Sequence, residues 1–147
     1  MVVRVQSAPF DPAGAIGGFA TGCKRVGAIV TFTGIVRDLS GSPLKKMRIE
    51  HYPGMTEKAI MAMVDTATQR WSLRDCLVIH RYGDLEPGDT IMMVATATAH
   101  RSDAFAAAEY LMDYLKSRAP FWKKEITDQG ARWVTAKDDD EAALGRW

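Results

Sequence analysis

The chain has 147 residues and a formal net charge of +1. This length suits one compact domain that buries a core of its own. A protein that binds duplex nucleic acid normally carries a broad basic face, so the balanced charge argues against that class. A small anionic ligand, held by a local group of cations, fits the composition better.

Cysteine spacing and apolar runs exclude two further classes. Cys23 and Cys76 lack a CxxC spacing and a nearby Cys/His cluster, which argues against a zinc site and favours two buried thiols in a reducing cytosol. No stretch approaches eighteen apolar residues, and the N-terminus lacks a basic segment followed by an apolar core and a cleavage site. We therefore expect a soluble cytoplasmic protein with no membrane contact and no metal.

The order of elements predicts one α+β domain over residues 1–147, with a mixed or antiparallel sheet and two long helices. Asp11 is the expected cap of a short helix that begins at Pro12. The turn Glu86-Pro87-Gly88-Asp89 separates two of the expected strands. Turn residues bound all four strands that the pattern predicts: Ala28–Val36, Met47–Tyr52, Leu77–Tyr82 and Thr90–Ala99.

The two long helices are expected at Thr56–Trp71 and Asp103–Arg118, with Thr56 and Ser102 as their caps. Tyr110 and Tyr114 form a separate stripe on the second helix, suited to core packing or to a dimer contact. The apolar stripe of the first helix consists of Ala59, Ile60, Met63, Val64 and Ala67. The expected core face of the second consists of Phe105, Ala108, Leu111, Met112 and Leu115.

The segment that runs from Asp113 to Glu125 contains four cations among aromatic and apolar residues around Pro120. Proline ends a helix and biases the preceding residue away from helical angles, so Lys116 falls in the last helical turn and Lys123 just past the break. Two ammonium groups can then converge on one pocket. The alternative is that Lys116 only complements the helix dipole and Lys123 is solvated.

Two further groups of cations stand where strands end. His100 and Arg101 lie between an expected strand and an expected helix start, close to free backbone N–H groups that favour a phosphate or carboxylate. Arg37 ends the first long strand, and its planar fork can hold a phosphate through two hydrogen bonds. Each has a structural alternative: a hydrogen-bonded histidine, an arginine paired with a neighbouring acid, and a local pair between Arg37 and Asp38.

The remaining polar residues have structural interpretations. For His51 and His80, packing at strand ends is simpler than acid–base chemistry. The acidic tail 137–141, from Lys137 to Glu141, is expected to be a solvated face or the cap of a helix over Glu141–Arg146, and Trp147 has a ring that can dock on the domain.

Five strings together resemble, in this order, the catalytic (large) subunit of molybdopterin synthase: VTFTGIVRD, EHYPGMTEKA, IHRYGDLEPGD, TATAHRSDAF and MDYLKSRAPFWKKE. The resemblance extends from about Gly27 to Trp133. It is specific, because AHRS followed at this interval by YLKSRAPFWKKE is far more restrictive than a short motif. It implies an α/β hammerhead-like fold. It also implies a sulfurtransferase that converts a cyclic pyranopterin monophosphate into the dithiolene of molybdopterin.

The resemblance also implies partners. The sulfur arrives as a thiocarboxylate on the terminal glycine of a small ubiquitin-like subunit ending in Gly-Gly, so this chain needs no cofactor or metal of its own. A heterotetramer is implied, with a central homodimer of this subunit and one small subunit at each end. Two alternatives stay open: a docking module that only captures the Gly-Gly tail, and an enzyme that acts on another phosphorylated metabolite.

The same resemblance implies roles for individual residues. Lys116 is the principal catalytic lysine beside the thiocarboxylate, assisted by Lys123, and crowding by other cations would lower the pKa of Lys116 toward neutrality. Arg37, His100 and Arg101 would bind phosphate and pterin, the last two in the same chain or across a dimer interface. Glu125 would hold Lys123. The full substrate-binding set is Ile35, Val36, Arg37, His100, Arg101, Lys116, Lys123, Lys124 and Glu125. Ile35 stands where relatives can have a basic residue, so its contact must be apolar or through the backbone.

Overall fold

The strands form two four-stranded sheets in the computed structural model, which describes residues 1–134 and 138–147. The first sheet has the order β1 (Val2–Gln6), β4 (Asp75–Arg81), β6 (Thr90–Thr98) and β2 (Ala28–Ile35). The second has the order β5 (Gly83–Leu85), β3 (Leu44–His51), β7 (Phe121–Thr127) and β8 (Gly130–Val134). Only the β1–β4 pair is parallel among the pairings described. The α+β class with mixed pairing is confirmed, but the strands divide between two sheets instead of one.

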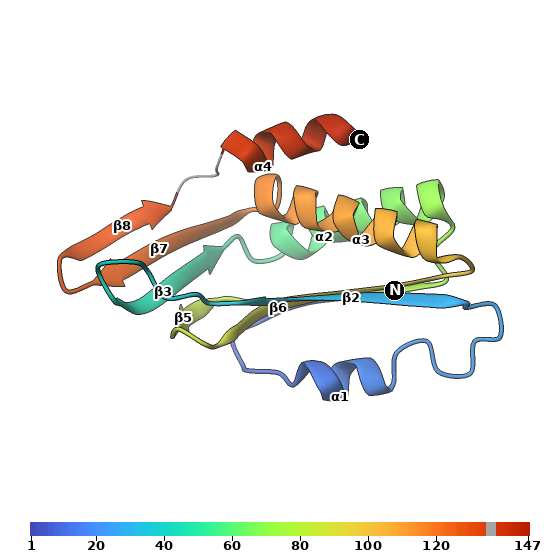
Figure 1. Cartoon of the computed structure of the whole chain (residues 1–147), viewed down its shortest axis with the longest axis horizontal. Helices are drawn as coiled ribbons and strands as arrows, with labels where there is room; N and C mark the ends of the chain where they lie inside the picture. The colour runs from blue at the N-terminus through green and yellow to red at the C-terminus, as the bar shows by residue number, and fades with distance from the viewer. Residues whose placement is uncertain (135–137) are drawn as a thin grey trace.

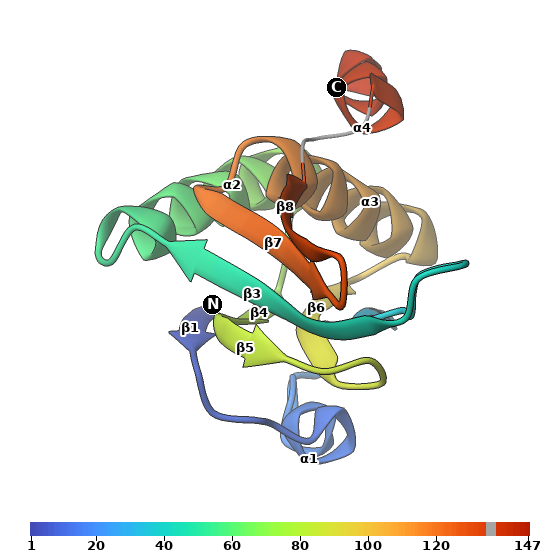
Figure 2. The same ribbon diagram turned by 90° about the vertical axis from the view of Figure 1, so that its left-hand side faces the viewer.

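The helices lie on both faces of the first sheet. Figures 1 and 2 show α2 (Met55–Trp71) and α3 (Arg101–Ser117) side by side on one face, and α1 (Pro12–Gly17) on the other. The short α4 (Asp138–Ala143) and a 3₁₀ turn (Leu144–Arg146) lie on the outer side of α3. Because both faces of β4 and β6 are covered, these two strands are apolar along most of their length.

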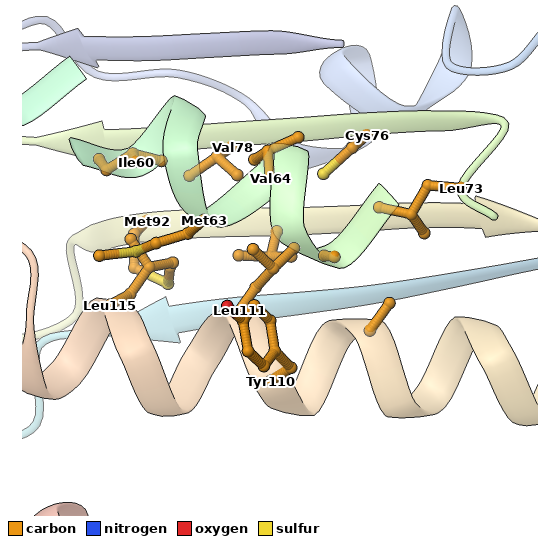
Figure 3. Packing of buried hydrophobic residues seen from close by; sticks show 13 residues of the cluster. Ile60, Met63, Val64, Leu73, Cys76, Val78, Met92, Tyr110, Leu111 and Leu115 are labelled. Carbon is orange, nitrogen blue, oxygen red and sulfur yellow. The ribbon is translucent and has the colours of Figure 1, made fainter. Parts of the chain in front are cut away.

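The main core lies between the helix pair and the first sheet. Ile60 and Val64 of α2 and Leu111 of α3 pack against Val78 of β4 (Figure 3). Val94 of β6 belongs to the same cluster. Successive strand residues point to opposite faces, so a second set of β4 and β6 side chains packs under α1. That set contains Leu77, Ile79, Met93 and Ala95, with Ile16 and Phe19 against it.

The observed helix starts differ from the expected ones. Gly54 precedes α2 at φ +82°, and its N–H donates to the Glu57 carboxylate at 2.9 Å. Thr56 is buried inside the first turn, where its hydroxyl donates to the Tyr52 carbonyl and accepts from the Tyr52 N–H. His100, not Ser102, is the cap residue of α3. The assignments of Thr56 and Ser102 as caps were wrong, whereas Asp11 caps α1 as expected.

The register of α3 also corrects two expectations. Phe105 was expected in the core, but 61% of its surface is exposed. Tyr110 is only 3% exposed and packs against Trp71, Trp147 and Tyr114. Tyr110 is therefore a core residue of this chain, and its use as a dimer contact was wrong.

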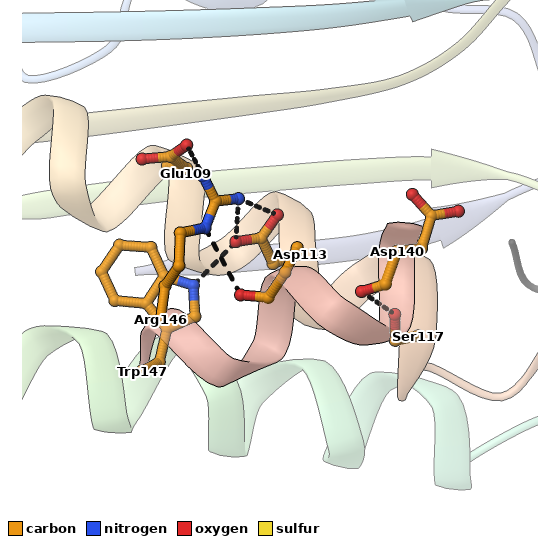
Figure 4. A network of polar contacts seen from close by, with 7 residues as sticks. Glu109, Asp113, Ser117, Asp140, Arg146 and Trp147 are labelled. Atoms are coloured by element: carbon orange, nitrogen blue, oxygen red, sulfur yellow. Dashed lines mark hydrogen bonds and ion pairs between the residues drawn. The ribbon is translucent and has the colours of Figure 1, made fainter. Parts of the chain in front are cut away.

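The C-terminal residues dock on α3 (Figure 4). Arg146 pairs with Asp113 at 2.8 Å and with Glu109, and the Trp147 indole donates to Asp113 at 2.7 Å. The expected helix over Glu141–Arg146 is thus present as α4 followed by the 3₁₀ turn. Lys137, the first residue of the expected acidic tail, lies outside the described residues.

Four strands were not expected from the sequence: β1, β5, β7 and β8. The omission of β7 matters most, because it carries Lys123. Its run Lys123-Lys124-Glu125 interrupts the apolar alternation by which strands are recognised.

Two further expectations concern cysteines and membranes. Cys23 is exposed, so the expectation of two buried thiols was wrong for it. Cys76 is buried, and burial raises the pKa of its thiol to about 12, which keeps it protonated and unreactive. None of the helices among the described residues is long and apolar enough to cross a membrane.

Candidate active site

Lys116 and Lys123 line the same cavity, which has a volume of about 280 Å³. Lys116 belongs to the last turn of α3, and Lys123 is the third residue of β7. The other walls come from β2 with Ile35, from β4 with His80 and from β6 with Met92. The expectation that two lysines on either side of Pro120 meet in one pocket is therefore realised by the fold.

The chain reverses sharply between the two lysines. The N–H groups of Arg118 and Ala119 both donate to the Tyr114 carbonyl, at 2.7 and 3.2 Å, which closes the helix. Pro120 has no N–H and cannot extend the helical ladder. The Phe121 N–H then donates to the Ala119 carbonyl at 2.8 Å, and β7 begins. This short connection brings the lysine of the helix end beside the lysine of the strand.

Alternation along β7 decides which of its side chains reach the cavity. Phe121, Lys123 and Glu125 share one face of the strand, and Lys124 points to the other face. There the Lys124 ammonium lies 4.4 Å from the centre of the Trp133 ring, a cation–π distance. Lys124 therefore does not join the lysine pair, and its place in the substrate-binding set stays a prediction.

Electrostatics single out Lys123. Its side chain is partly buried, and burial first, then the charge of Lys116, lowers the pKa of Lys123, while Asp140 acts in the opposite direction. Arg118, another cation of the segment between Asp113 and Glu125, pairs with Glu141 at 2.9 Å. A lysine with a lowered pKa is a better proton carrier near neutral pH than an ordinary one.

A neighbouring, larger cavity of about 870 Å³ contains Arg37 and Glu125 in its lining. Glu125 stands two residues after Lys123 on the same face of β7, about 7 Å along the strand. Its carboxylate pairs with Arg132 at 3.3 Å, so the expectation that Glu125 holds Lys123 was wrong. Asp38 accepts hydrogen bonds from the N–H groups of Leu39 and Leu44. Asp38 therefore stabilises the loop between β2 and β3 and does not form the local pair with Arg37.

Ile35 and Val36 differ in what they offer a ligand. Ile35 is 56% exposed and presents an apolar wall to the lysine cavity. Val36 is buried, its N–H donates to the Asp89 carbonyl and its own carbonyl accepts from the Gly88 N–H. Both its side chain and its backbone groups are thus used inside the fold, and substrate contact by Val36 stays a prediction.

His100 and Arg101 lie far from the lysine pair in this chain. They line a separate cavity of about 520 Å³ at the start of α3, beside Gly27. The backbone approaches closely there, since a Cβ on Gly27 would lie 2.3 Å from the Ala99 carbonyl oxygen. Lys116 is at the other end of α3, about 22 Å away along the helix axis. One copy of the chain therefore cannot bring His100 and Arg101 to Lys116.

His80 is a cavity residue that the sequence interpretation set aside. It is 3% exposed, its ring stacks on Phe121 at 3.8 Å between centroids, and it lines the cavity with both lysines. Burial, followed by the charges of Lys123 and His51, lowers the pKa of His80 to about 3, against the opposing effect of the Arg81 carbonyl. The available signal was a polar residue near the end of an otherwise apolar strand.

Together, the fold and the cavities define an α+β protein with a lysine pair in one cavity and Arg37 in a cavity beside it. Among the described residues, no group of three or more His, Cys, Asp or Glu side chains is arranged to hold a metal ion.

Comparisons with known proteins agree with this class. The sequence profile described as "MoaE protein" matches residues 5–118. The molybdopterin synthase catalytic subunit of Cereibacter sphaeroides is 66% identical over 147 residues, covering all of both chains. The molybdopterin biosynthesis MoaE protein of Burkholderia ambifaria superposes with a TM-score of 0.85 at 47% identity, over 99% of this chain and 97% of that one. A molybdopterin synthase structure from Staphylococcus aureus gives a TM-score of 0.82 at 29% identity, over 90% and 96%.

The chain belongs to the MoaE protein family, as the match over most of its length and the 66% identity to a catalytic subunit show.

Proposed function

We propose that this chain is the catalytic subunit of a molybdopterin synthase, with residues 1–147 acting as one domain in the cytoplasm. It transfers sulfur from the C-terminal thiocarboxylate of a small ubiquitin-like subunit to a cyclic pyranopterin monophosphate, forming the dithiolene. Family membership and the names of its relatives support the reaction. The observation that carries the proposal is the convergence of Lys116 and Lys123 on one cavity.

The two lysines have different roles in this proposal, because Lys116 is exposed and Lys123 is partly buried. Lys116 is exposed at the helix end, where the terminal carboxyl group of a partner can reach it. Once the thiocarboxylate sulfur is bonded to the pterin side chain, water attacks the acyl carbon, and the Lys116 ammonium stabilises the oxyanion that forms on the acyl oxygen. The carbon–sulfur bond then breaks, which leaves the sulfur on the pterin and a carboxylate on the partner. Lys123 is partly buried and has a lowered pKa, so it takes up and returns the protons that move as oxygen leaves the pterin side chain. This assigns proton transfer to Lys123, whereas the sequence placed the lowered pKa on Lys116.

Arg37 holds the substrate phosphate in this proposal. It lines the cavity adjacent to the lysines, and its guanidinium can donate two parallel hydrogen bonds to phosphate oxygens. A substrate with its phosphate anchored there can extend its pterin side chain toward the lysine cavity, because Ile35, two residues before Arg37 in the chain, lines that cavity together with Lys123.

His100 and Arg101 complete the site from a second copy of the chain. Their separation from Lys116 supports a shared site, because they can approach the lysine pair only across an interface. Exposed apolar side chains near them, Ile29 on β2 and Phe105 on α3, support an interface on this side of the molecule. The proposed assembly is a central homodimer with one small sulfur-carrier subunit at each end.

The test is reconstitution from purified parts. Mixing the chain with a thiocarboxylated Gly-Gly partner and the cyclic precursor should yield dithiolene product, whereas the partner with an ordinary C-terminal carboxylate should not. Lys116→Ala should abolish product while the protein stays folded, since an exposed lysine contributes little to stability. Lys58→Ala, which removes an exposed lysine of α2, is the matched control and should be fully active.

Two results would contradict the proposal. Near-normal turnover by folded Lys116→Ala would remove the central assignment. Tight binding of the partner tail without any product from the wild-type chain would favour a docking module instead.

A further inference from the structure

His80 is a buried residue in the wall of the lysine cavity. Its ring is nearly parallel to that of Phe121, with an interplanar angle of 16° and centroids 3.8 Å apart. Phe121 and Lys123 share one face of β7, so the strand that carries Lys123 also supplies the surface on which His80 rests. His51 also lies near Phe121, with ring centroids 6.4 Å apart.

The hydrogen bond at Nδ1 determines the tautomer of His80. Nδ1 lies 2.8 Å from the Arg81 carbonyl oxygen, which can only accept. Nδ1 must therefore carry the hydrogen, and the neutral ring keeps its lone pair on Nε2. Burial and the neighbouring charges keep this ring neutral across the physiological range, because its pKa falls to about 3.

Apart from His80, each polar side chain of the cavity either only donates hydrogen bonds or can both donate and accept them. The ammonium groups of Lys116 and Lys123 only donate, and the Thr33 hydroxyl can donate or accept. His80 Nε2 offers a pure acceptor without a negative charge. A carboxylate in this place would hold a lysine proton firmly and would repel an anionic substrate, whereas a neutral imidazole does neither.

We propose that His80 is a positioning residue for Lys123, and that its Nε2 accepts a hydrogen bond from the Lys123 amino group and fixes that group in the cavity. The catalytic consequence rests on the proposed function, but the hydrogen bond itself does not. The groups that face His80 are Lys123 from β7, Lys116 from α3 and His51 from β3, and Asp140 of α4 acts on Lys123.

Two substitutions separate this role from a structural one. His80→Asn retains a donor near the position of Nδ1 for the Arg81 carbonyl but has nothing at the position of Nε2. His80→Gln reaches the position of Nε2 and restores an acceptor there. A residue needed only to satisfy the Arg81 carbonyl would be replaced well by Asn. A residue needed to position Lys123 would be replaced better by Gln.

The readout is the pH dependence of Lys123 acetylation by acetic anhydride, followed by mass spectrometry of the peptide, with Lys58 as the internal reference. In His80→Asn the labelling midpoint of Lys123 should fall by about one pH unit, because its ammonium form loses one charge-assisted hydrogen bond. In His80→Gln it should stay near the wild-type value. His51→Asn is the matched control, since His51 does not line the cavity, and should leave the midpoint unchanged.

A second measurement needs no substitution at His80. In wild-type protein labelled with ¹⁵N-histidine, the Nε2 resonance of His80 should move as Lys123 titrates and should stop moving in Lys123→Met. The proposal would be overturned if the pH midpoint of Lys123 acetylation were unchanged in folded His80→Asn. It would also be overturned if the His80 Nε2 resonance did not shift as Lys123 titrates. Failure of wild-type protein to make dithiolene while both effects appear would overturn the proposed function and leave this inference standing.

Discussion

Lys123 carries its charge in a place where both burial and Lys116 disfavour it. Such a residue lowers the stability of the folded chain whenever it is protonated, and natural proteins retain groups of this kind where activity needs them. A single substitution of Lys123 should therefore raise the stability of the protein and lower its turnover.

Lys123→Met should stabilise the protein at pH 7 and lower turnover about a hundredfold or more, since general acid–base groups contribute at least that much. The direction of this stability change with pH follows from proton binding by Lys123. The folded-state pKa lies below 10.5, so the cost of the charge is complete below the folded pKa and disappears as pH rises toward 10.5. Urea unfolding at pH 7 and pH 10 checks this: the advantage of the Met variant should be larger at pH 7. An advantage that grows with pH would contradict it.

His80 should make the fold acid-sensitive. Its pKa falls from 6.5 to about 3 on folding, so between these values the unfolded chain binds a proton that the folded chain does not. Stability therefore decreases as pH falls through this window, by about 2 kcal/mol between pH 6.5 and pH 4.5. Urea unfolding over this range measures the slope. His80→Gln should reduce the slope, and an identical slope in both proteins would show that other groups cause the acid sensitivity.

At the scale of elements, α3 is stabilised along its outer side by the C-terminal residues. Trp147 stacks edge-on against Trp71 and Tyr110 at 5.3 and 5.6 Å, and Arg118 pairs with Glu141 of α4. The Ser117 hydroxyl also donates to the Asp140 carbonyl at 3.1 Å. These contacts hold the end of α3, and with it Lys116, against a second element.

Trp147→Ala should destabilise the protein by about 2 kcal/mol, because it removes two aromatic contacts and the hydrogen bond to Asp113. Thermal unfolding measures the change. Trp122→Ala is the comparison, since half of the Trp122 surface is exposed and its removal should cost clearly less. Equal losses for the two tryptophans would mean that the docking seen in Figure 4 contributes little.

At the scale of the whole molecule, the residues expected to bind substrate are divided between two ends of α3. Lys116 lies at one end, and His100 with Arg101 at the other. A rigid helix cannot bend to close a gap of about 22 Å. A second copy, related by two-fold symmetry, can place one end of its helix beside the other end of the first.

Mixing Arg101→Ala with Lys116→Ala chains should therefore restore activity. If protomers exchange at random, half of the dimers are mixed, and each has one intact site and one site with both defects, which gives roughly a quarter of wild-type activity. Turnover before and after mixing, with tagged co-purification to show exchange, is the measurement. Mixed dimers as inactive as their parents would show that each site is built from one chain.

Local chemistry made much of the chain predictable. The strands β2, β4 and β6 and the helices α2 and α3 follow from apolar periodicity, and α1 from its Asp11 cap. Proline geometry alone placed Lys116 before and Lys123 after the break. The caps of α2 and α3 were not predictable in the same way, because Thr56 and Ser102 have the right chemistry but Gly54 and His100 occupy the cap positions.

The sequence by itself determined the family, the element types and the residues able to carry charge, since these depend on residue identity and short-range spacing. Only the tertiary structure decided which of those residues meet. It brought His80 to the lysines through stacking on Phe121, directed Lys124 away through strand alternation, used Val36 inside the fold, and separated His100 and Arg101 from Lys116 along α3. Pairing between strands distant in the chain and the length of one helix set these distances, and neither is encoded in any single segment.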